Sequence, residues 1–261
     1  MSTRVRPGPI PTVIYGVHPV VETLKAGKRR IEEIYLGKEP PGDSDLSALL
    51  LASGVPVSLV SGRRLVSIAG TPHHQGVAAR VEPFPYTDVR DILSESAVGR
   101  EVLLILDEIQ DPANLGSILR SAECLGSAGV IISKDRAVSI TPTVEKASAG
   151  ASAHVPVART VNLVRGMEQV KTAGYWIYAA EMKAGEICYE VDLTGKIAFV
   201  LGSEGKGLRR LVRKQCDREI SIPVVGKINS LNVAQTAAIL LAESFRQRVL
   251  GAAASKNTLD K

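Results

Sequence analysis

The chain has 261 residues, of which 45% are hydrophobic and 23% charged, enough for one large domain or for a medium and a small one. Aromatic residues make up only 4%, which excludes aromatic stacking as the main way of holding nucleic acid. The net charge of +5 and the pI of about 9.1 suit a polyanionic partner, because cations that neutralise phosphates release counterions. A basic enzyme that binds no nucleic acid is the alternative that charge leaves open.

Cysteine usage and the chain termini indicate a compartment. Cys124, Cys188 and Cys216 show no metal-ligand spacing and cannot all pair, so we expect a reducing cytoplasm, no zinc site and no disulfide framework. No stretch approaches the length of a membrane span. Residues 1–12 lack the apolar run of a signal peptide. We expect both tails to be disordered, and the first is a candidate for contacting RNA.

The first segment, residues 13–82, alternates short helix and strand patterns. Helices are predicted over 18–26 and 43–52, and strands over 31–36, 55–60 and 76–81. This order is typical of a small α/β domain. Two prolines, Pro83 and Pro85, then favour an extended linker over residues 83–98, with a short helix near 89–93.

The second domain, residues 99–250, alternates apolar strands with helices. Strands are predicted over 102–106, 130–132, 154–158, 176–180, 197–201 and 219–222. Helices are predicted over 115–125, 144–149, 162–172, 208–215 and 231–248. This pattern predicts a largely parallel sheet covered on both faces. Such sheets bind ligands beyond the carboxyl ends of their strands, where the loops 107–120, 202–207 and 223–232 stand out.

The glycine-rich loop 202–207 fits neither common nucleotide-binding motif. Gly205 and Gly207 begin a dinucleotide fingerprint, but Arg210 occupies the place of its third glycine. A phosphate-binding loop fails as well, because Lys206 is not followed by Ser or Thr. This argues against a Rossmann oxidoreductase. The loop either brings backbone close to another ligand or is an ordinary glycine turn.

Basic residues follow this loop at helical spacing. They are either phosphate contacts or a solvated face, since cations early in a helix oppose its dipole. The set is Lys206, Arg209, Arg210, Arg213 and Lys214.

Polar residues in the other two loops have local structural explanations as well. Asp111 or Asn114 could cap the helix after the first loop. Arg120 lies in a helix that otherwise looks buried, so we expect it to have an anionic partner, either an internal carboxylate or a substrate group. Ser230 is a natural N-cap for the final helix, whereas Asn232 has no evident structural role.

Together the three loops resemble the signature motifs of the SpoU (TrmH-like) family of RNA 2′-O-ribose methyltransferases, within the SPOUT superfamily. The motifs are Asn114-x-Gly116-x-x-x-Arg120-x-Ala122, Leu201-Gly202-Ser203-Glu204-Gly205-x-Gly207, and Ile222-Pro223 through Ser230-Leu231-Asn232-Val233. Residues 14–18 and 74–77 resemble the family's N-terminal substrate-binding domain. The resemblance therefore covers nearly the whole chain.

This resemblance implies an α/β fold in which a small N-terminal α/β substrate-binding domain precedes a parallel-sheet SPOUT domain with a trefoil knot. Knots are very rare, so topology rules alone would have excluded one. The family binds S-adenosylmethionine in the knotted loops and forms homodimers with catalytic groups near the subunit interface. RNA is the implied partner, with no DNA and no membrane.

The layout is similar to family members that methylate a guanosine of 23S rRNA, either as naked RNA or in a ribosomal assembly intermediate. Ribose methylation of tRNA and an RNA-binding protein that has lost catalysis are the alternatives. An additional N-terminal domain favours rRNA, since simpler tRNA relatives tend to lack it.

Site residues carry over by motif position, and no metal is implied. The implied cofactor-binding residues are Leu201, Gly202, Gly205, Ile222, Pro223 and Leu231, and the implied catalytic residues are Arg120, Asn114, Glu204, Ser230 and Asn232. Arg120 is closest to the chemistry, as a general base or as an electrostatic stabiliser. A guanidinium does not readily lose a proton, so Glu204 or water could take the proton instead.

Overall fold

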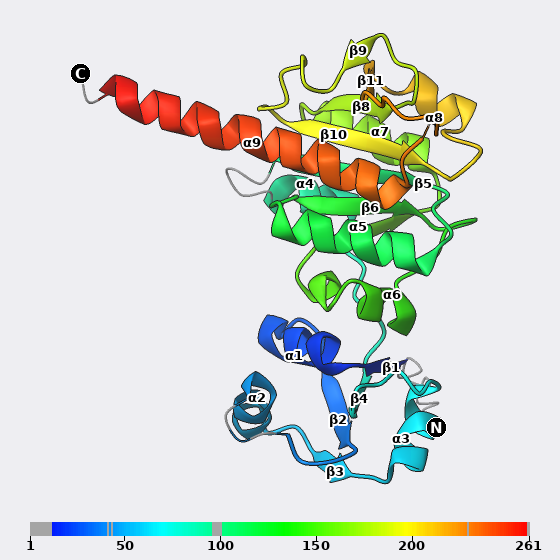
Figure 1. Ribbon diagram of the computed structural model, residues 1–261, viewed down its shortest axis with the longest axis vertical. Helices are drawn as coiled ribbons and strands as arrows, with labels where there is room; N and C mark the ends of the chain where they lie inside the picture. Colours follow the sequence, from blue (N-terminus) through cyan, green and yellow to red (C-terminus); the bar gives the residue numbers. More distant parts are fainter. Residues whose placement is uncertain (1–11, 41, 43, 96–100, 229, 260–261) are drawn as a thin grey trace, which may run out of the picture. The chain divides into compact units, whose positions relative to one another are not determined.

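The computed structural model describes residues 12–40, 42, 44–95, 101–228 and 230–259 (Figure 1). The N-terminal tail before Thr12, Asp43 of the predicted second helix, the end of the predicted linker and Asn229 of the third motif lie outside these residues. The chain divides into two compact units. Unit 1 contains the chain up to Pro85 together with Ala149–His154, and unit 2 contains Tyr86–Ser148 and the chain from Val155 onward.

Unit 1 is built on a four-stranded sheet in the order β1-β4-β2-β3 (Figure 1). The strands are β1 (Thr12–Tyr15), β2 (Ile31–Leu36), β3 (Val57–Leu59) and β4 (Val77–Val81). β4 is antiparallel to both of its neighbours, and β2 and β3 are parallel. The carboxyl ends of β1, β2 and β3 therefore meet at one edge of the sheet, beside the start of β4.

Three helices cover this sheet. Neighbouring strand residues face opposite sides, so Ile14 packs in the core cluster of α1 (Val17–Ala26) and α2 (Asp45–Ser53), whereas Tyr15 packs with Leu65 of α3 (Gly62–Ala69). The predicted helices α1 and α2 are confirmed within two residues. The sequence did not predict α3, which Ser61 caps by accepting from the backbone N–H of Arg64. A short 3-10 helix, η1 (Ala151–Ala153), also belongs to unit 1.

Unit 2 is a seven-stranded sheet in the order β7-β6-β5-β10-β8-β11-β9, and every pair of neighbours is parallel, as predicted. The strands are β5 (Val102–Asp107), β6 (Gly129–Ser133), β7 (Val157–Thr160), β8 (Trp176–Ala180), β9 (Glu186–Ile187), β10 (Ile197–Gly202) and β11 (Arg218–Ser221). Within this unit only the two-residue strand β9 has no counterpart in the sequence prediction, and in unit 1 the strand β1 has none.

Helices cover both faces of this sheet, which confirms the prediction of a sheet covered on both sides. On one face α4 (Val89–Glu95), α7 (Leu163–Thr172) and α8 (Arg210–Lys214) bury apolar residues in a common core cluster. On the other face α5 (Pro112–Cys124) lies alongside α9 (Val233–Leu259), and both contact the central strands (Figure 1). The short helix α6 (Pro142–Ala147) packs against α5.

Several ends of elements differ from the prediction. α5 begins at Pro112 and not at Leu115, and β7 spans Val157–Thr160 and not 154–158. Two further differences have local reasons. α6 begins two residues early, because Thr141 caps it and Pro142 takes the first helical position. α9 continues to Leu259 instead of ending near Arg248, so the expectation of a disordered tail from Gly251 is wrong. Alanines 252–254 favour helix and extend it. The trefoil knot stays a prediction.

Among the residues the structure describes, no helix is both long and apolar enough to cross a membrane. The same residues contain no group of three or more His, Cys, Asp or Glu side chains arranged to hold a metal ion.

Candidate active site

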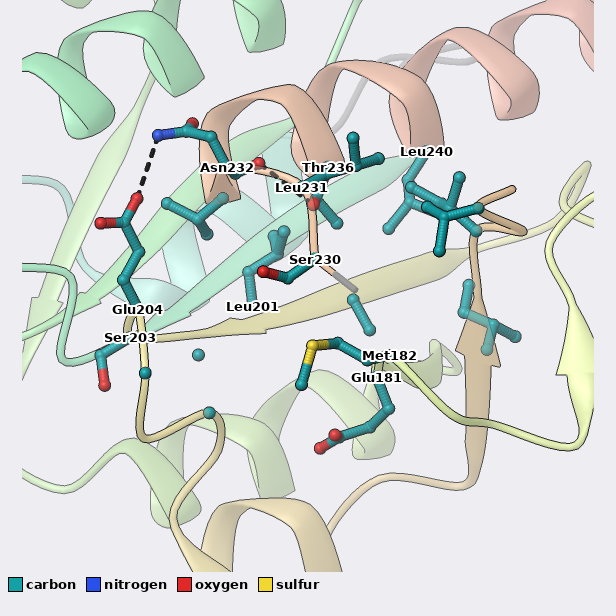
Figure 2. Close-up of a pocket in the computed structure, with 18 residues that line it drawn as sticks. Glu181, Met182, Leu201, Ser203, Glu204, Ser230, Leu231, Asn232, Thr236 and Leu240 are labelled. Carbon is teal, nitrogen blue, oxygen red and sulfur yellow. Dashed lines mark hydrogen bonds between the residues drawn. The ribbon is translucent and has the colours of Figure 1, made fainter. Parts of the chain in front are cut away.

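A cavity of about 410 Å³ lies at the carboxyl ends of β8, β10 and β11 (Figure 2). Its walls come from the ends of these strands, from the glycine-rich loop after β10, and from the segment that leads into α9. Three chain segments far apart in the sequence thus meet where parallel α/β sheets bind their ligands.

Eight of the predicted site residues line this cavity. From the predicted cofactor set they are Leu201, Gly202, Gly205, Ile222 and Leu231, and from the predicted catalytic set they are Glu204, Ser230 and Asn232. Pro223 does not line the cavity, although Ile222 and Val224 on either side of it do.

The glycine-rich loop folds back on itself after β10. The backbone N–H of Gly207 donates to the carbonyl of Ser203 at 2.9 Å, and Gly205 and Gly207 both adopt positive φ. A side chain at Gly202 would collide with the backbone of Gly207 and come within 2.6 Å of the nitrogen of Leu208. The loop can therefore fold back only because position 202 has no side chain. The folded loop forms part of the cavity wall.

One residue from each motif joins a hydrogen-bonded trio of Asn114, Glu204 and Asn232. The Asn114 amide donates to Glu204 Oε1 at 2.8 Å. The Asn232 amide donates to the same oxygen at 3.0 Å (Figure 2) and to Asn114 Oδ1 at 2.9 Å. Because these bonds use both amide hydrogens of Asn232 and fix which way each amide faces, the trio holds the glutamate in one orientation.

The capping of α5 leaves Asn114 available for this trio. Asp111 Oδ1 accepts from the backbone N–H of Ala113 at 2.8 Å, so Asp111 is the N-cap that the sequence left undecided. Asn114 is instead 8% exposed and faces Glu204.

The start of α9 corrects the assignment of its cap. Asn232 Oδ1 accepts from the backbone N–H of Ala234 at 2.8 Å, and the helix begins at Val233. Ser230 is therefore not the N-cap, because it lies three residues before the helix. Asn232 is the N-cap of α9, a role that the sequence did not reveal. Its Oδ1 caps the helix, while its Nδ2 donates the two hydrogen bonds of the trio. Ser230 lies exposed on the cavity wall.

Arg120 lies apart from the cavity. It does not line it, and it is exposed on the stripe of α5 that carries Ala113, Ser117 and Cys124. Six residues separate it from Asn114, which turns it by about 240° around the helix axis. Within the described part of the chain no hydrogen bond or ion pair reaches its guanidinium. The expectation that Arg120 is buried is therefore wrong. Of its two predicted partners, no internal carboxylate contacts it among the described residues, and a substrate group stays a prediction.

Two of the five basic residues near α8 have internal partners. The Arg209 guanidinium binds Asp107 Oδ1 at 2.6–2.7 Å, and its backbone N–H donates to Asp107 Oδ2 at 2.9 Å. Arg213 binds Glu219 through two hydrogen bonds of 2.6 Å. These two cations therefore hold the fold together, and Lys206, Arg210 and Lys214 are left for phosphate contacts or a solvated face.

Sequence reasoning missed two acidic residues at strand ends. Asp107 is fully buried at the end of β5 and anchors the end of the glycine-rich loop through Arg209. Glu181 follows β8 and lines the cavity. The available signal was a carboxylate directly after an apolar strand, at the edge where ligands bind.

Known proteins resemble the chain in both units. The sequence profile of the SpoU rRNA Methylase family matches residues 101–242, and that for RNA 2′-O ribose methyltransferase substrate binding matches residues 13–87. The 23S rRNA (guanosine-2′-O-)-methyltransferase RlmB of Xylella fastidiosa is 39% identical over 242 residues, 91% of this chain and 97% of that protein. RlmB of Escherichia coli K12 is 37% identical over 241 residues, 90% of this chain and 98% of its own length.

A solved structure shares the fold and contains the cofactor. The SpoU methyltransferase AviRb of Streptomyces viridochromogenes, in complex with AdoMet, has a TM-score of 0.78 and 25% identity, covering 91% of this chain and 90% of that one. The family profile, the identity to RlmB and this fold agree with the three motifs that meet at the cavity. The chain belongs to the SpoU rRNA methylase family.

Proposed function

We propose that this protein methylates the ribose 2′-hydroxyl of a guanosine in 23S rRNA, with S-adenosylmethionine as the methyl donor. One observation carries the proposal: the trio of Asn114, Glu204 and Asn232 joins all three motifs beside a cavity at the carboxyl edge of the sheet. Similarity to RlmB along nine tenths of the chain supports the choice of rRNA.

The cavity fits S-adenosylmethionine by size and by chemistry. Its volume of about 410 Å³ lies within the range of small-molecule sites. The apolar side chains of Leu201, Ile222 and Leu231 suit a flat base, and the lining carboxylates suit a cation. The residues of the wall proposed to hold the cofactor are Leu201, Gly202, Gly205, Ile222 and Leu231. Pro223, which does not line the cavity, would act only by fixing the backbone between Ile222 and Val224. When bound, the cofactor supplies a methyl group already activated by its sulfonium.

Protein groups must then orient the ribose and accept its proton. We assign the proton to Glu204, because its Oε1 is held by two amides while none of the residues the structure describes bonds to its Oε2. Arg120 acts as an electrostatic stabiliser of the forming alkoxide or of an adjacent phosphate, since guanidinium remains charged. Ser230, exposed at the cavity wall, contributes a hydroxyl for orienting the substrate.

The exposure of Arg120 supports a homodimer. An exposed cation without a partner needs a second surface to become part of a water-excluded site. α9 also leaves Phe245, Val249 and Leu250 between 48% and 55% exposed. A second copy that covers these helices would bring Arg120 to a subunit interface. Sedimentation at several protein concentrations tests this, and a monomer at all of them would refute it.

RNA binding is assigned to the N-terminal unit, with residues 13–82 as the substrate-binding domain, 83–98 as the linker and 99–250 as the methyltransferase domain. The edge where β1, β2 and β3 end carries exposed Lys38, Arg63, Arg64 and His73. Cations gathered at one edge suit the phosphates of rRNA, as free RNA or as part of a ribosomal assembly intermediate in the cytoplasm.

The decisive experiment maps 2′-O-methyl groups in total RNA from cells with and without this protein. A site in 23S rRNA that disappears with the protein supports the proposal. A lost site in tRNA favours the tRNA alternative, and an unchanged map together with RNA binding favours a catalytically silent protein.

A further inference from the structure

Glu181 occupies a fixed place on the cavity wall. It directly follows β8, and its backbone N–H donates to the carbonyl of Ile220 at 2.9 Å, which ties it to the neighbouring strand β11. Figure 2 shows Glu181 and Met182 across the cavity from Asn232 and Thr236. Its side chain is only 20% exposed.

Glu181 and Glu204 are the only charged side chains among the described residues that line the cavity, and both are acidic. Glu204 is held by the amides of Asn114 and Asn232. No lysine, arginine or histidine of the described chain lines the wall. The lining therefore gives the cavity a negative electrostatic potential. Among the described residues no side-chain amide donates a hydrogen bond to the carboxylate of Glu181.

The nearest cation among the described residues neutralises Glu181 only in part. Arg213 Nε lies 3.8 Å from a Glu181 oxygen, yet the same guanidinium makes two hydrogen bonds of 2.6 Å to Glu219. Burial raises the pKa of Glu181, Arg213 opposes this rise, and Glu219 adds to it. An ionised Glu181 is thus costly in the empty site, and a bound cation would relieve that cost.

We propose that Glu181 is the counter-charge for the sulfonium of S-adenosylmethionine and makes the site prefer this donor to the uncharged product, S-adenosylhomocysteine. The inference rests on the proposed function and identifies a specificity residue outside the three motifs. Methyl transfer moves the methyl from sulfur to the ribose oxygen, and the hydroxyl proton passes to the protein or to water. The sulfur becomes neutral, so the attraction to Glu181 ends and the product is released more readily.

Calorimetry with the full-length protein tests the inference with three ligands that differ in charge at one position. S-adenosylmethionine carries a sulfonium, sinefungin an amine in its place, and S-adenosylhomocysteine a neutral sulfur. We expect Glu181→Gln to weaken binding of the two cationic ligands about tenfold, the scale of one close opposite charge. Its affinity for S-adenosylhomocysteine should stay within about twofold of wild type.

A matched control is Glu168→Gln, which removes an exposed carboxylate on α7 of the same unit that neither lines the cavity nor contacts Arg213. It should keep the wild-type ratio of affinities. Glu181→Asp retains the charge and should keep most of the preference for the cationic ligands. It tests the role of the charge if Glu181→Gln proves to be less stable than wild type. An equal loss for all three ligands would overturn the assignment, because it would place the carboxylate on a group they share.

The two proposals fail in different ways. A wild-type protein that binds none of the three ligands refutes the proposed function itself. A wild type that binds them, combined with an unchanged ratio in Glu181→Gln, refutes only the role of Glu181.

Discussion

The side-chain amide of Asn232 donates to the side-chain oxygen of Asn114 at 2.9 Å, across 118 positions of the chain. This bond joins the start of α9 to the first turns of α5, and both residues also donate to Glu204. Each amide has a distinct donor and acceptor end, so the trio tolerates only one arrangement. Its geometry therefore depends on amides that no carboxylate can replace.

Asn114→Asp tests this dependence. The change replaces the donor that faces Glu204 Oε1 at 2.8 Å by an oxygen, so two acceptors and two negative charges oppose each other. We expect single-turnover methyl transfer to fall by at least ~100-fold, the scale of losing an oriented electrostatic group, and the free energy of unfolding to drop by ~1–3 kcal/mol. The matched control is Asn162→Asp, which caps α7 and should be neutral because Asp caps equally well. Unchanged transfer in Asn114→Asp would show that the trio has no part in the reaction.

Gly202→Ala tests the turn that shapes the cavity. The added methyl would collide with the backbone of Gly207, so the glycine-rich loop must shift. We expect cofactor affinity to fall at least ~10-fold and stability to fall by ~1–3 kcal/mol, as for overpacked sites. Calorimetry and thermal melting on the same samples measure both effects. Gly195→Ala has open space around its added methyl and should change neither; full cofactor affinity in Gly202→Ala would separate the turn from the cofactor site.

Local sequence patterns are sufficient to define some elements of this fold. β2 and β8 have the predicted bounds, because apolar strands are defined by their own residues. The helix α3 was missed although Leu65, Ile68 and Ala69 lie on one face, because it is only eight residues long and begins at Gly62, which lowers helix propensity.

The candidate site shows the same limit. The motifs supplied eight residues of the cavity wall, yet nothing local distinguished Ser230 from Asn232 as the cap of α9. That choice depends on Glu204, which is 28 positions away from Asn232. The exposure of Arg120 could have been predicted, because a residue six positions from Asn114 faces another side of the helix.

Arg120 is the residue for separating catalysis from stability. It is exposed and makes no ion pair with the described residues, so Arg120→Ala should leave the melting temperature of the monomeric fold nearly unchanged. We expect the variant to bind cofactor normally and to lose methyl transfer by at least ~100-fold. Arg120→Lys should not restore the rate if a planar fork holds phosphate or alkoxide.

The control for Arg120 is Arg165→Ala, an exposed arginine on α7 in the same unit. It should retain full activity. Recovery of the rate in Arg120→Lys would favour a role as a base, because lysine loses a proton more easily than arginine. A strongly lowered melting temperature in Arg120→Ala would instead assign the residue a structural role.

The three cysteines should differ sharply in reactivity. Cys124 is exposed, whereas burial raises the pKa of Cys216 to about 12 and Cys188 is fully buried. Since the thiolate is the reactive form, iodoacetamide at pH 8 should label Cys124 first in the monomer and the other two only on unfolding. In the proposed dimer, Cys124 shares the covered stripe of α5 with Arg120 and should react more slowly. Mass spectrometry of the folded protein measures the order. Rapid labelling of Cys216 would contradict its burial.

The raised pKa of Cys216 also gives stability a direction with pH. The folded protein keeps the thiol proton to higher pH than the unfolded chain, so this contribution is complete below the usual thiol pKa and is lost as pH rises toward about 12. Denaturation by urea between pH 8 and pH 11 should show a smaller loss for Cys216→Ala than for wild type, once their difference at pH 7 is subtracted.

The basic edge of the N-terminal unit should govern affinity for RNA without touching the cofactor. Arg63→Ala and Lys38→Ala each remove an exposed cation beside the ends of β3 and β2. If each contacts one phosphate, RNA affinity should fall, and the slope of log affinity against log salt should decrease by about one per residue. Arg30→Ala, at the opposite edge of the same sheet, is the matched control. Fluorescence anisotropy of a labelled 23S rRNA fragment at several salt concentrations gives the slope, and calorimetry checks that cofactor binding is retained. An unchanged slope in both variants would assign the RNA contact to another surface, because a phosphate contact cannot be removed without altering the number of counterions released.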